Sequence, residues 1–211
     1  MVSVLPADRM QELVFATHNE HKTREIQAIL SHEYRILSLD DVAFRDPVPE
    51  NEDSLEGNAS QKARYVHQRL GKDCFADDTG LEVDCLNGAP GVYSARYADL
   101  TDEKKADEPA SEANIRKLLA RMHGETDRKA RFRTVIALIL EGRKYIFEGM
   151  VTGVILSGRR GSGGFGYDPV FLPSGYTETF AEMSLEQKNI ISHRALAVLE
   201  LVTFLKKYRP G

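Results

Sequence analysis

Apolar and polar residues alternate along the chain with two periods, one typical of strands and the other of helices. Short apolar runs rich in β-branched and aromatic residues predict strands at 13–17, 34–39, 74–76, 81–86, 132–140 and 145–156. Apolar residues three and four positions apart predict helices around 26–30 and at 54–70, 101–123 and 192–208. This order mixes crossover connections with hairpins, so the sequence predicts an α/β fold with a mixed β-sheet flanked by helices.

Several helices and turns have local signals of their own. Residues that favour a helix N-cap precede three helices: Asp53 or Ser54, the capping-box pattern Ser184–Gln187, and Ser192. Glu56 is placed to close a capping box on Asp53. We expect a hairpin turn at Glu141-Gly142. A tight turn is expected at Asp77-Asp78, between two short strands.

The composition excludes several classes of protein. With 28 Lys and Arg residues against 32 Asp and Glu residues, the formal net charge is −4, so the basic surface of a general duplex-DNA binder is missing. No apolar stretch approaches the ~20 residues that span a bilayer, and Asp8 and Arg9 interrupt the start, where a secretory signal would be apolar. Two cysteines are too few for a disulfide framework. We therefore expect a cytoplasmic protein that binds neither nucleic acid nor membranes.

A polar loop leads from the first predicted strand into the first helix. It consists of Thr17, His18, Asn19, Glu20, His21 and Lys22. The N-terminus of a helix presents unpaired N–H groups and a partial positive charge, which favour phosphate. Lys22 would add a point charge for phosphate oxygens. Such residues are also ordinary in turns, so the loop alone does not decide between the two interpretations.

Two acidic clusters contain the candidate metal ligands. The first comprises Glu50, Glu52, Asp53 and Glu56, and the second is Asp77 and Asp78. Carboxylates suit Mg²⁺, which prefers oxygen ligands and keeps several waters when it binds with a phosphorylated substrate. Helix capping and solvation are the better interpretation for Glu52, Asp53 and Glu56. The aspartate pair follows an apolar strand, so at least one of its charges lies near the core and needs a partner.

The glycine-rich segment 161–166 matches the dinucleotide-binding pattern G-x-G-x-x-G. We reject that match because the pattern requires a preceding strand and a following helix, whereas 167–173 contains two prolines and β-type residues and is expected to be extended. A P-loop sequence is also missing. The segment suits close approach of the backbone to a flat base, with Phe165 and Tyr167 offering aromatic faces for stacking.

Basic residues stand near two helix starts at the C-terminal end of the chain. Lys188 and Arg194 cannot share a face of one unbroken helix, so we expect Lys188 on a turn and His193-Arg194 in the first turn of the last helix. Cations there oppose the helix dipole, which indicates an anionic or acceptor-rich partner nearby. The alternative is that both cations face solvent.

Together, these segments resemble the inosine triphosphate pyrophosphatase family, whose members hydrolyse non-standard purine nucleoside triphosphates. The resemblance extends from Leu13 to about Leu205. Its motifs are Thr17-x-Asn19-x-x-Lys22, 55–59 with Lys62-Ala63, 76–81, 88–97, 165–169, 181–183, Lys188-Asn189 and 192–194. Several motifs in consistent order are more specific than any one of them. The loop at 17–22 departs from the family pattern because His18 and His21 make it bulkier.

The resemblance implies an elongated, two-lobed α/β fold with a central substrate cleft, one domain at 13–211 after an extension at 1–12, and a homodimer. The implied activity is Mg²⁺-dependent hydrolysis of ITP, dITP and XTP to the monophosphate and pyrophosphate, which cleanses the nucleotide pool. Asp78 would be the catalytic carboxylate and a metal ligand, Glu50 the second ligand, and Asp77 and Lys62 further catalytic residues. The implied substrate contacts are 17–22, Thr79, Phe165, Gly166, Tyr167, Asp168, Lys188, His193 and Arg194.

Base selection is expected at purine C6, where inosine and xanthosine carry a carbonyl and adenosine an amino group. Donors from the His193-Arg194 turn or from the backbone would satisfy the carbonyl and leave the amino group unpaired. Rejection of guanine does not follow from this argument. Two other functions stay open: a pyrophosphatase of the septum-inhibitor type for modified pyrimidine nucleotides, and a non-catalytic nucleotide sensor or nucleic-acid-binding module. The purine-loop motifs disfavour the first, and the acidic pair and net charge disfavour the second.

Overall fold

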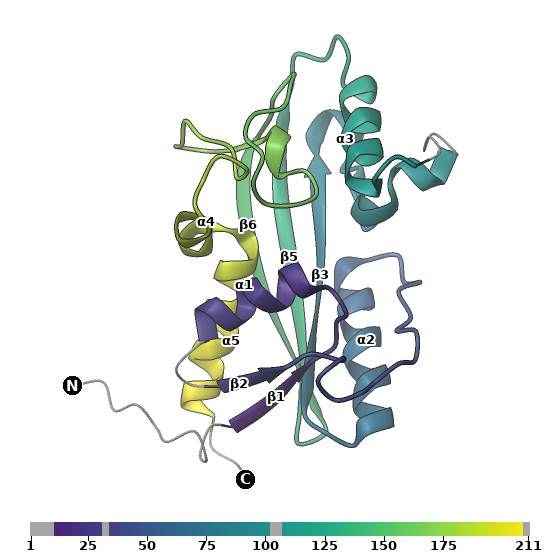
Figure 1. Ribbon diagram of the computed structural model, residues 1–211, viewed down its shortest axis with the longest axis vertical. Helices are drawn as coiled ribbons and strands as arrows, with labels where there is room; N and C mark the ends of the chain where they lie inside the picture. The colour runs from purple at the N-terminus through teal and green to yellow at the C-terminus, as the bar shows by residue number, and fades with distance from the viewer. Residues whose placement is uncertain (1–10, 31–33, 102–106, 209–211) are drawn as a thin grey trace, which may run out of the picture. The chain divides into compact units, whose positions relative to one another are not determined.

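The structure of the chain is a computed structural model that describes residues 11–30, 34–101 and 107–208 (Figure 1). The extension predicted at 1–12 lies outside these residues, except for Gln11 and Glu12, which already belong to the first strand. Within the described ranges, no helix is both long enough and apolar enough to cross a membrane.

A mixed β-sheet and helices make up the described part of the chain. The strands are β1 (Gln11–Phe15), β2 (Tyr34–Leu37), β3 (Cys74–Val83), β4 (Pro90–Gly91), β5 (Lys129–Leu140), β6 (Arg143–Ile155) and β7 (Phe171–Pro173). The α-helices are α1 (Glu20–Leu30), α2 (Leu55–Leu70), α3 (Ala110–Arg121), α4 (Leu185–Ile191) and α5 (His193–Lys207). The sheet order is β2-β1-β3-β5-β6-β7, with β4 beside β3. Because β1 is parallel to β2 and β3, while β4 and β7 are antiparallel to their neighbours, the predicted mixed α/β fold is confirmed.

The chain divides into two compact units, each assembled from separated stretches of sequence. The first unit contains the described residues up to Asp78, together with 135–149 and the residues from Arg194 onward. Its hydrophobic core takes side chains from β1, α1, β3, β5 and α5. The rings of Phe15 and Phe75 stack in this core with their centroids 4.5 Å apart. Segments distant in sequence therefore build one core.

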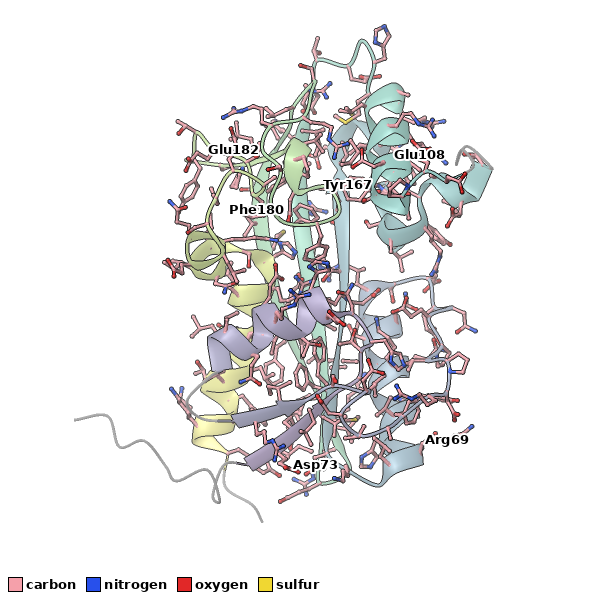
Figure 2. The ribbon with its side chains drawn as sticks, in the orientation of Figure 1. Arg69, Asp73, Glu108, Tyr167, Phe180 and Glu182 are labelled. Atoms are coloured by element: carbon pink, nitrogen blue, oxygen red, sulfur yellow. The ribbon has the colours of Figure 1, made fainter. Side chains whose placement is uncertain are left out.

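The second unit contains 79–134 and 150–193, as far as these residues are described. Its core combines residues of β3, α3 and β5 with the aromatic residues of 167–180. Phe171 packs 4.8 Å from Phe132 and 5.3 Å from Phe180, measured between ring centroids. Figure 2 labels Tyr167 and Phe180, two aromatic residues of this core.

Strand β3 corrects the predicted organisation of the acidic pair. The sequence predicts two short strands with a turn at Asp77-Asp78, but β3 runs without a break from Cys74 to Val83. The prediction of a turn was wrong because each carboxylate finds cationic partners on its own side of the strand. A paired charge can be buried in a strand at far lower cost than an isolated one.

Two helix predictions also need correction. Helix α3 begins at Ala110, directly after Pro109, whereas the pattern placed its start at Thr101; part of the predicted first turns, 102–106, lies outside the described residues. Proline suits the boundary because it cannot donate a backbone hydrogen bond inside a helix. Lys188, expected on a turn, lies within α4, which the predicted capping box at Ser184 begins. The hairpin at 141–142 is confirmed, with positive φ at both turn residues.

The N-cap of α2 can be tested by substitution, because the sequence offers two adjacent candidates, Asp53 and Ser54. The side chain of Ser54 accepts a hydrogen bond from the Gly57 N–H, so Ser54 and not Asp53 is the N-cap. We expect Ser54→Ala to lower the free energy of unfolding by about 1 kcal/mol in urea denaturation. The matched variant Asp53→Ala removes no cap and should change it by less than about 0.5 kcal/mol. Equal losses in the two variants would contradict the assignment.

Candidate active site

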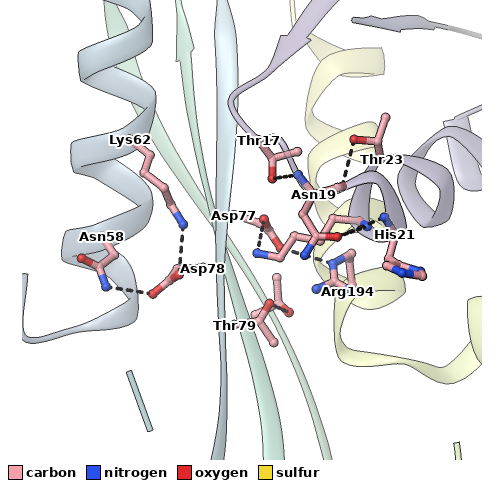
Figure 3. A network of polar contacts seen from close by, with 12 residues as sticks. Thr17, Asn19, His21, Thr23, Asn58, Lys62, Asp77, Asp78, Thr79 and Arg194 are labelled. Atoms are coloured by element: carbon pink, nitrogen blue, oxygen red, sulfur yellow. Dashed lines mark hydrogen bonds and ion pairs between the residues drawn. The ribbon is translucent and has the colours of Figure 1, made fainter. Parts of the chain in front are cut away.

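Asp77 and Asp78 project from opposite faces of β3, because successive side chains of a strand alternate in direction. Asp77 contacts residues of α1 and α5, and Asp78 contacts residues of α2. Figure 3 shows the two carboxylates on either side of the strand, each with its own partners. The adjacent aspartates therefore belong to two different polar clusters within the first unit.

The Asp78 cluster joins two carboxylates through one lysine. Lys62 Nζ lies 3.0 Å from Asp78 Oδ1 and 2.5 Å from Glu50 Oε1. Asn58 donates a hydrogen bond of 3.1 Å to the other carboxylate oxygen of Asp78. Lys62 is almost fully buried, whereas Glu50 keeps 40% of its side chain exposed. Glu50 and Asp78 thus contact the same ammonium group, and their role as metal ligands stays a prediction.

The pKa values in this cluster shift in different directions. Burial raises the pKa of Asp78 above its usual value, although Lys62 opposes that shift. Burial also acts on Glu50, but the adjacent Lys62 ammonium outweighs it and lowers the pKa of Glu50. Burial alone would lower the pKa of Lys62, yet the negative charges of Asp78 and Glu50 raise it. Lys62 therefore stays protonated between the two acids.

The Asp77 cluster consists of charges that are buried or nearly buried. Lys22 Nζ lies 2.8 Å from Asp77 Oδ1, and Arg194 Nε lies 3.2 Å from Oδ2. Burial would raise the pKa of Asp77, but Lys22 and Arg194 hold it well below the usual range. The guanidinium of Arg194 also donates to Glu25. With Asp77 and Arg194 each only 2% exposed, this cluster is part of the core.

Glu25 is a residue that the sequence analysis missed. A signal for it exists, because Lys22, Glu25, Ile26 and Ile29 follow the helical spacing of one face of α1. Two charged residues on the apolar face of a helix need buried partners. Arg194 supplies the partner of Glu25.

The loop at 17–22 uses its polar side chains to begin α1. Asn19 Oδ1 accepts hydrogen bonds from the N–H groups of His21 and Lys22, at 3.0 and 3.2 Å. Thr17 Oγ1 in turn accepts from the Asn19 N–H at 3.1 Å. His18 and Glu20 are exposed and contact Asp40 and Arg24, respectively. Asn19 thus caps the helix, and Lys22 is the residue of this loop that reaches the acidic strand.

In the second unit, Asp168 and Lys188 form a buried ion pair of 2.7 Å. The same oxygen of Asp168 accepts the Phe165 N–H at 2.8 Å. The Lys188 ammonium lies 4.8 Å from the centroid of the Phe165 ring, within the range of a cation–π contact. A Cβ at Gly164 would stand 2.1 Å from Asp168, so this position requires glycine. The glycine-rich segment is thus shaped around the Asp168 carboxylate.

The other residues predicted in this unit differ in exposure. Tyr167 is buried in the core and donates a hydrogen bond of 2.9 Å to the Ser94 carbonyl, and burial raises the pKa of its phenol. Phe165 is half-buried. His193 stacks on Phe132 with the ring centroids 4.6 Å apart. Thr79 exchanges a hydrogen bond of 2.7 Å with Thr134. Of the two aromatic residues proposed for stacking, Phe165 is therefore the less buried one.

The metal prediction can be compared with the donor atoms present. Within 11–30, 34–101 and 107–208, no group of three or more His, Cys, Asp or Glu side chains is arranged to hold a metal ion. Glu50 and Asp78 nevertheless meet at one positive charge, the Lys62 ammonium. Two carboxylates completed by water and phosphate oxygens are a donor set that Mg²⁺ accepts. The pair therefore fits a metal bound together with substrate.

Comparison with known proteins identifies the family. The model of the Ham1 family matches residues 13–204. The chain belongs to the Ham1 family. The Ham1 protein of Staphylococcus aureus is 38% identical, with a TM-score of 0.81 and coverage of 93% of this chain and 98% of that one. A HAM1 protein from Coxiella burnetii is 34% identical, with a TM-score of 0.83 and coverage of 94% and 100%.

Ham1 relatives with an assigned activity cover almost the whole chain as well. The dITP/XTP pyrophosphatase of Porphyromonas gingivalis is 54% identical over 198 residues, which are 93% of this chain and 98% of the relative. The dITP/XTP pyrophosphatase of Flavobacterium johnsoniae is 50% identical over 194 residues, or 92% and 97%. The resemblance drawn from the sequence motifs is thereby confirmed.

Proposed function

We propose that the chain is an Mg²⁺-dependent pyrophosphatase that converts ITP, dITP and XTP to the monophosphate and pyrophosphate and so removes these nucleotides from the pool. The observation that carries the proposal is the meeting of Glu50 and Asp78 at Lys62, in a member of the Ham1 family. Relatives with the name dITP/XTP pyrophosphatase support the choice of substrate.

Asp78 is the residue that we assign to proton transfer. Its raised pKa makes it a better proton acceptor than an ordinary aspartate. Asp77 is a poor candidate, since Lys22 and Arg194 stabilise its anion and keep it in the core. Asp78 takes a proton from the water whose oxygen attacks the α-phosphorus, the bond from that phosphorus to the bridging oxygen breaks, and pyrophosphate leaves.

Glu50 and Asp78 are the residues that would hold Mg²⁺. When bound, the ion would offset negative charge on the phosphate oxygens. Lys62 and Lys22 supply further positive charge in the same unit, which favours the charge that develops during phosphoryl transfer. Lys62 also keeps the two carboxylates together, because both contact its ammonium group.

We assign the purine base to the glycine-rich segment of the second unit. Phe165 offers a half-buried ring for stacking. N–H donors of this segment or of His193 would pair with the C6 carbonyl of hypoxanthine or xanthine, and an amino group at C6 would leave them unpaired. The contacts predicted at His18, Glu20, His21, Thr79, Gly166 and Arg194 stay predictions.

Gly164 allows a test of this assignment. We expect Gly164→Ala to raise KM for dITP about tenfold, or about 1.4 kcal/mol in affinity, because the new Cβ would displace Asp168 from Lys188 and from the Phe165 N–H. Gly158→Ala is a matched control in the same loop, because a Cβ at Gly158 meets nothing within 4 Å. Initial-rate kinetics of both variants would contradict the assignment if their KM values were equal.

The activity itself can be tested by pyrophosphate release from ITP, XTP, dITP, ATP and dTTP in the presence of Mg²⁺. The proposal expects release from the first three substrates and its loss when EDTA removes the metal. Preference for dTTP or for modified pyrimidine nucleotides would favour the septum-inhibitor type of enzyme. Nucleotide binding without turnover would indicate a sensor.

A homodimer in the cytoplasm is the assembly and location that we propose. The dimer follows from the resemblance to the inosine triphosphate pyrophosphatase family. Support for the cytoplasm comes from Cys74 and Cys85, which are both free cysteines, as is usual in a reducing compartment. Light scattering of the purified chain would test the dimer, and fractionation of cells that produce it would test the location.

A further inference from the structure

Asn58 occupies a fully buried position between the acidic loop and the acidic strand. It lies in the first turns of α2 with 1% of its surface exposed. Its side-chain oxygen accepts the Glu52 N–H at 3.0 Å, and its side-chain nitrogen donates to Asp78 Oδ2 at 3.1 Å (Figure 3 shows the second contact). One amide therefore connects the loop that carries Glu50 with the carboxylate of Asp78.

The two ends of this amide are not interchangeable. A backbone N–H can only donate, so the Glu52 N–H requires the Asn58 oxygen on its side. The NH₂ group must then face Asp78. Since Lys62 binds Oδ1 of Asp78 while Asn58 binds Oδ2, both oxygens of this carboxylate have fixed partners. The Asp78 side chain is thus held in one orientation from two sides.

We propose that Asn58 is a positioning residue that keeps the Asp78 carboxylate aligned with the Glu50 loop and thereby sets the rate of turnover. The inference rests on the proposed function, in which Asp78 accepts the proton of the attacking water. Asn58 acts through Asp78 and the loop and not on the nucleotide. Changes at Asn58 should therefore affect kcat far more than KM.

Two substitutions separate alignment of Asp78 from simple bracing of the loop. Asn58→Asp keeps an oxygen for the Glu52 N–H but turns a second carboxylate toward Asp78, and Asn58→Ala removes both contacts. If Asn58 positions Asp78, kcat should fall about 10²-fold in Asn58→Ala, the scale of a misplaced catalytic group. It should fall further in Asn58→Asp, with KM for dITP changed less than about threefold. If Asn58 only braces the loop, Asn58→Asp, which keeps the contact to the Glu52 N–H, should lose less activity than Asn58→Ala.

A second measurement does not depend on activity. In a double-mutant cycle of Tm, without nucleotide or metal, Asn58→Asp should lower Tm because two carboxylates face each other. Most of that loss should disappear in the presence of Asp78→Asn, whose amide can donate to the new carboxylate. Asn114→Asp is the matched control, since Asn114 is also a buried helical asparagine but bonds to the backbone of 95–98 in the second unit. Its Tm loss should be independent of Asp78→Asn.

The two measurements distinguish failure of this inference from failure of the proposed function. An Asn58→Asp enzyme that loses less kcat than Asn58→Ala, or a Tm loss that Asp78→Asn does not relieve, would overturn the positioning role. A parent chain that releases no pyrophosphate from dITP would overturn the proposed function instead, and the Tm cycle would still decide whether Asn58 and Asp78 are coupled.

Discussion

Asp78→Asn should reduce kcat for dITP by about 10³-fold while leaving the fold intact. The substitution keeps the shape of the side chain but removes a negative charge and the proton acceptor, whose loss typically lowers rates by 10²- to 10⁴-fold. Lys62 still has Glu50 as a partner, so a buried cation is not left alone. Pyrophosphate release and circular dichroism of the variant would check both parts. A variant with parental kcat would refute the role of Asp78.

Asp77→Asn should instead cause a large loss of stability. Lys22 and Arg194 both pair with Asp77, and Arg194 also pairs with Glu25. Removing the Asp77 charge therefore leaves Glu25 as the one anion described in this cluster. Breaking a buried ion pair by removing one partner costs about 3–5 kcal/mol, which corresponds to a decrease in Tm of roughly 10 °C for a chain of this size.

Asp78→Asn is the natural control for Asp77→Asn, because it makes the same chemical change at the next residue of β3. Thermal unfolding of the two variants, monitored by circular dichroism, should show the larger decrease in Tm for Asp77→Asn, because Lys62 keeps Glu50 as a partner in Asp78→Asn. Equal decreases in Tm would contradict the assignment of Asp77 to stability and of Asp78 to catalysis.

Local signals were sufficient for the elements whose causes are local. The turn at Glu141-Gly142 and the cap at Ser184 were predicted from a few neighbouring residues, and both are confirmed. The start of α3 was misplaced because charged residues before Pro109 continue a helix-like pattern. Here the proline was the better signal.

The errors around the acidic strand have a different cause. Asp77-Asp78 was interpreted as a tight turn between two short strands. A partner that stabilises Asp77 inside the strand, Arg194, lies 117 positions further along the chain, and no local pattern reveals that contact. Similarly, the Ser94 carbonyl that binds the Tyr167 hydroxyl is 73 positions away, so an aromatic residue on a glycine-rich loop could not be recognised as a core residue. Motifs located the candidate residues, and only the fold assigned them to separate clusters.

The late position of Arg194 also has a consequence for biosynthesis. The first unit needs α5 for its core and Arg194 for Asp77, yet both follow the entire second unit in the order of translation. A nascent chain that has emerged only as far as β6 therefore has Lys22 beside Asp77 but lacks Arg194, the second counter-charge. Helix α5 must therefore be synthesised before the first unit can complete its core.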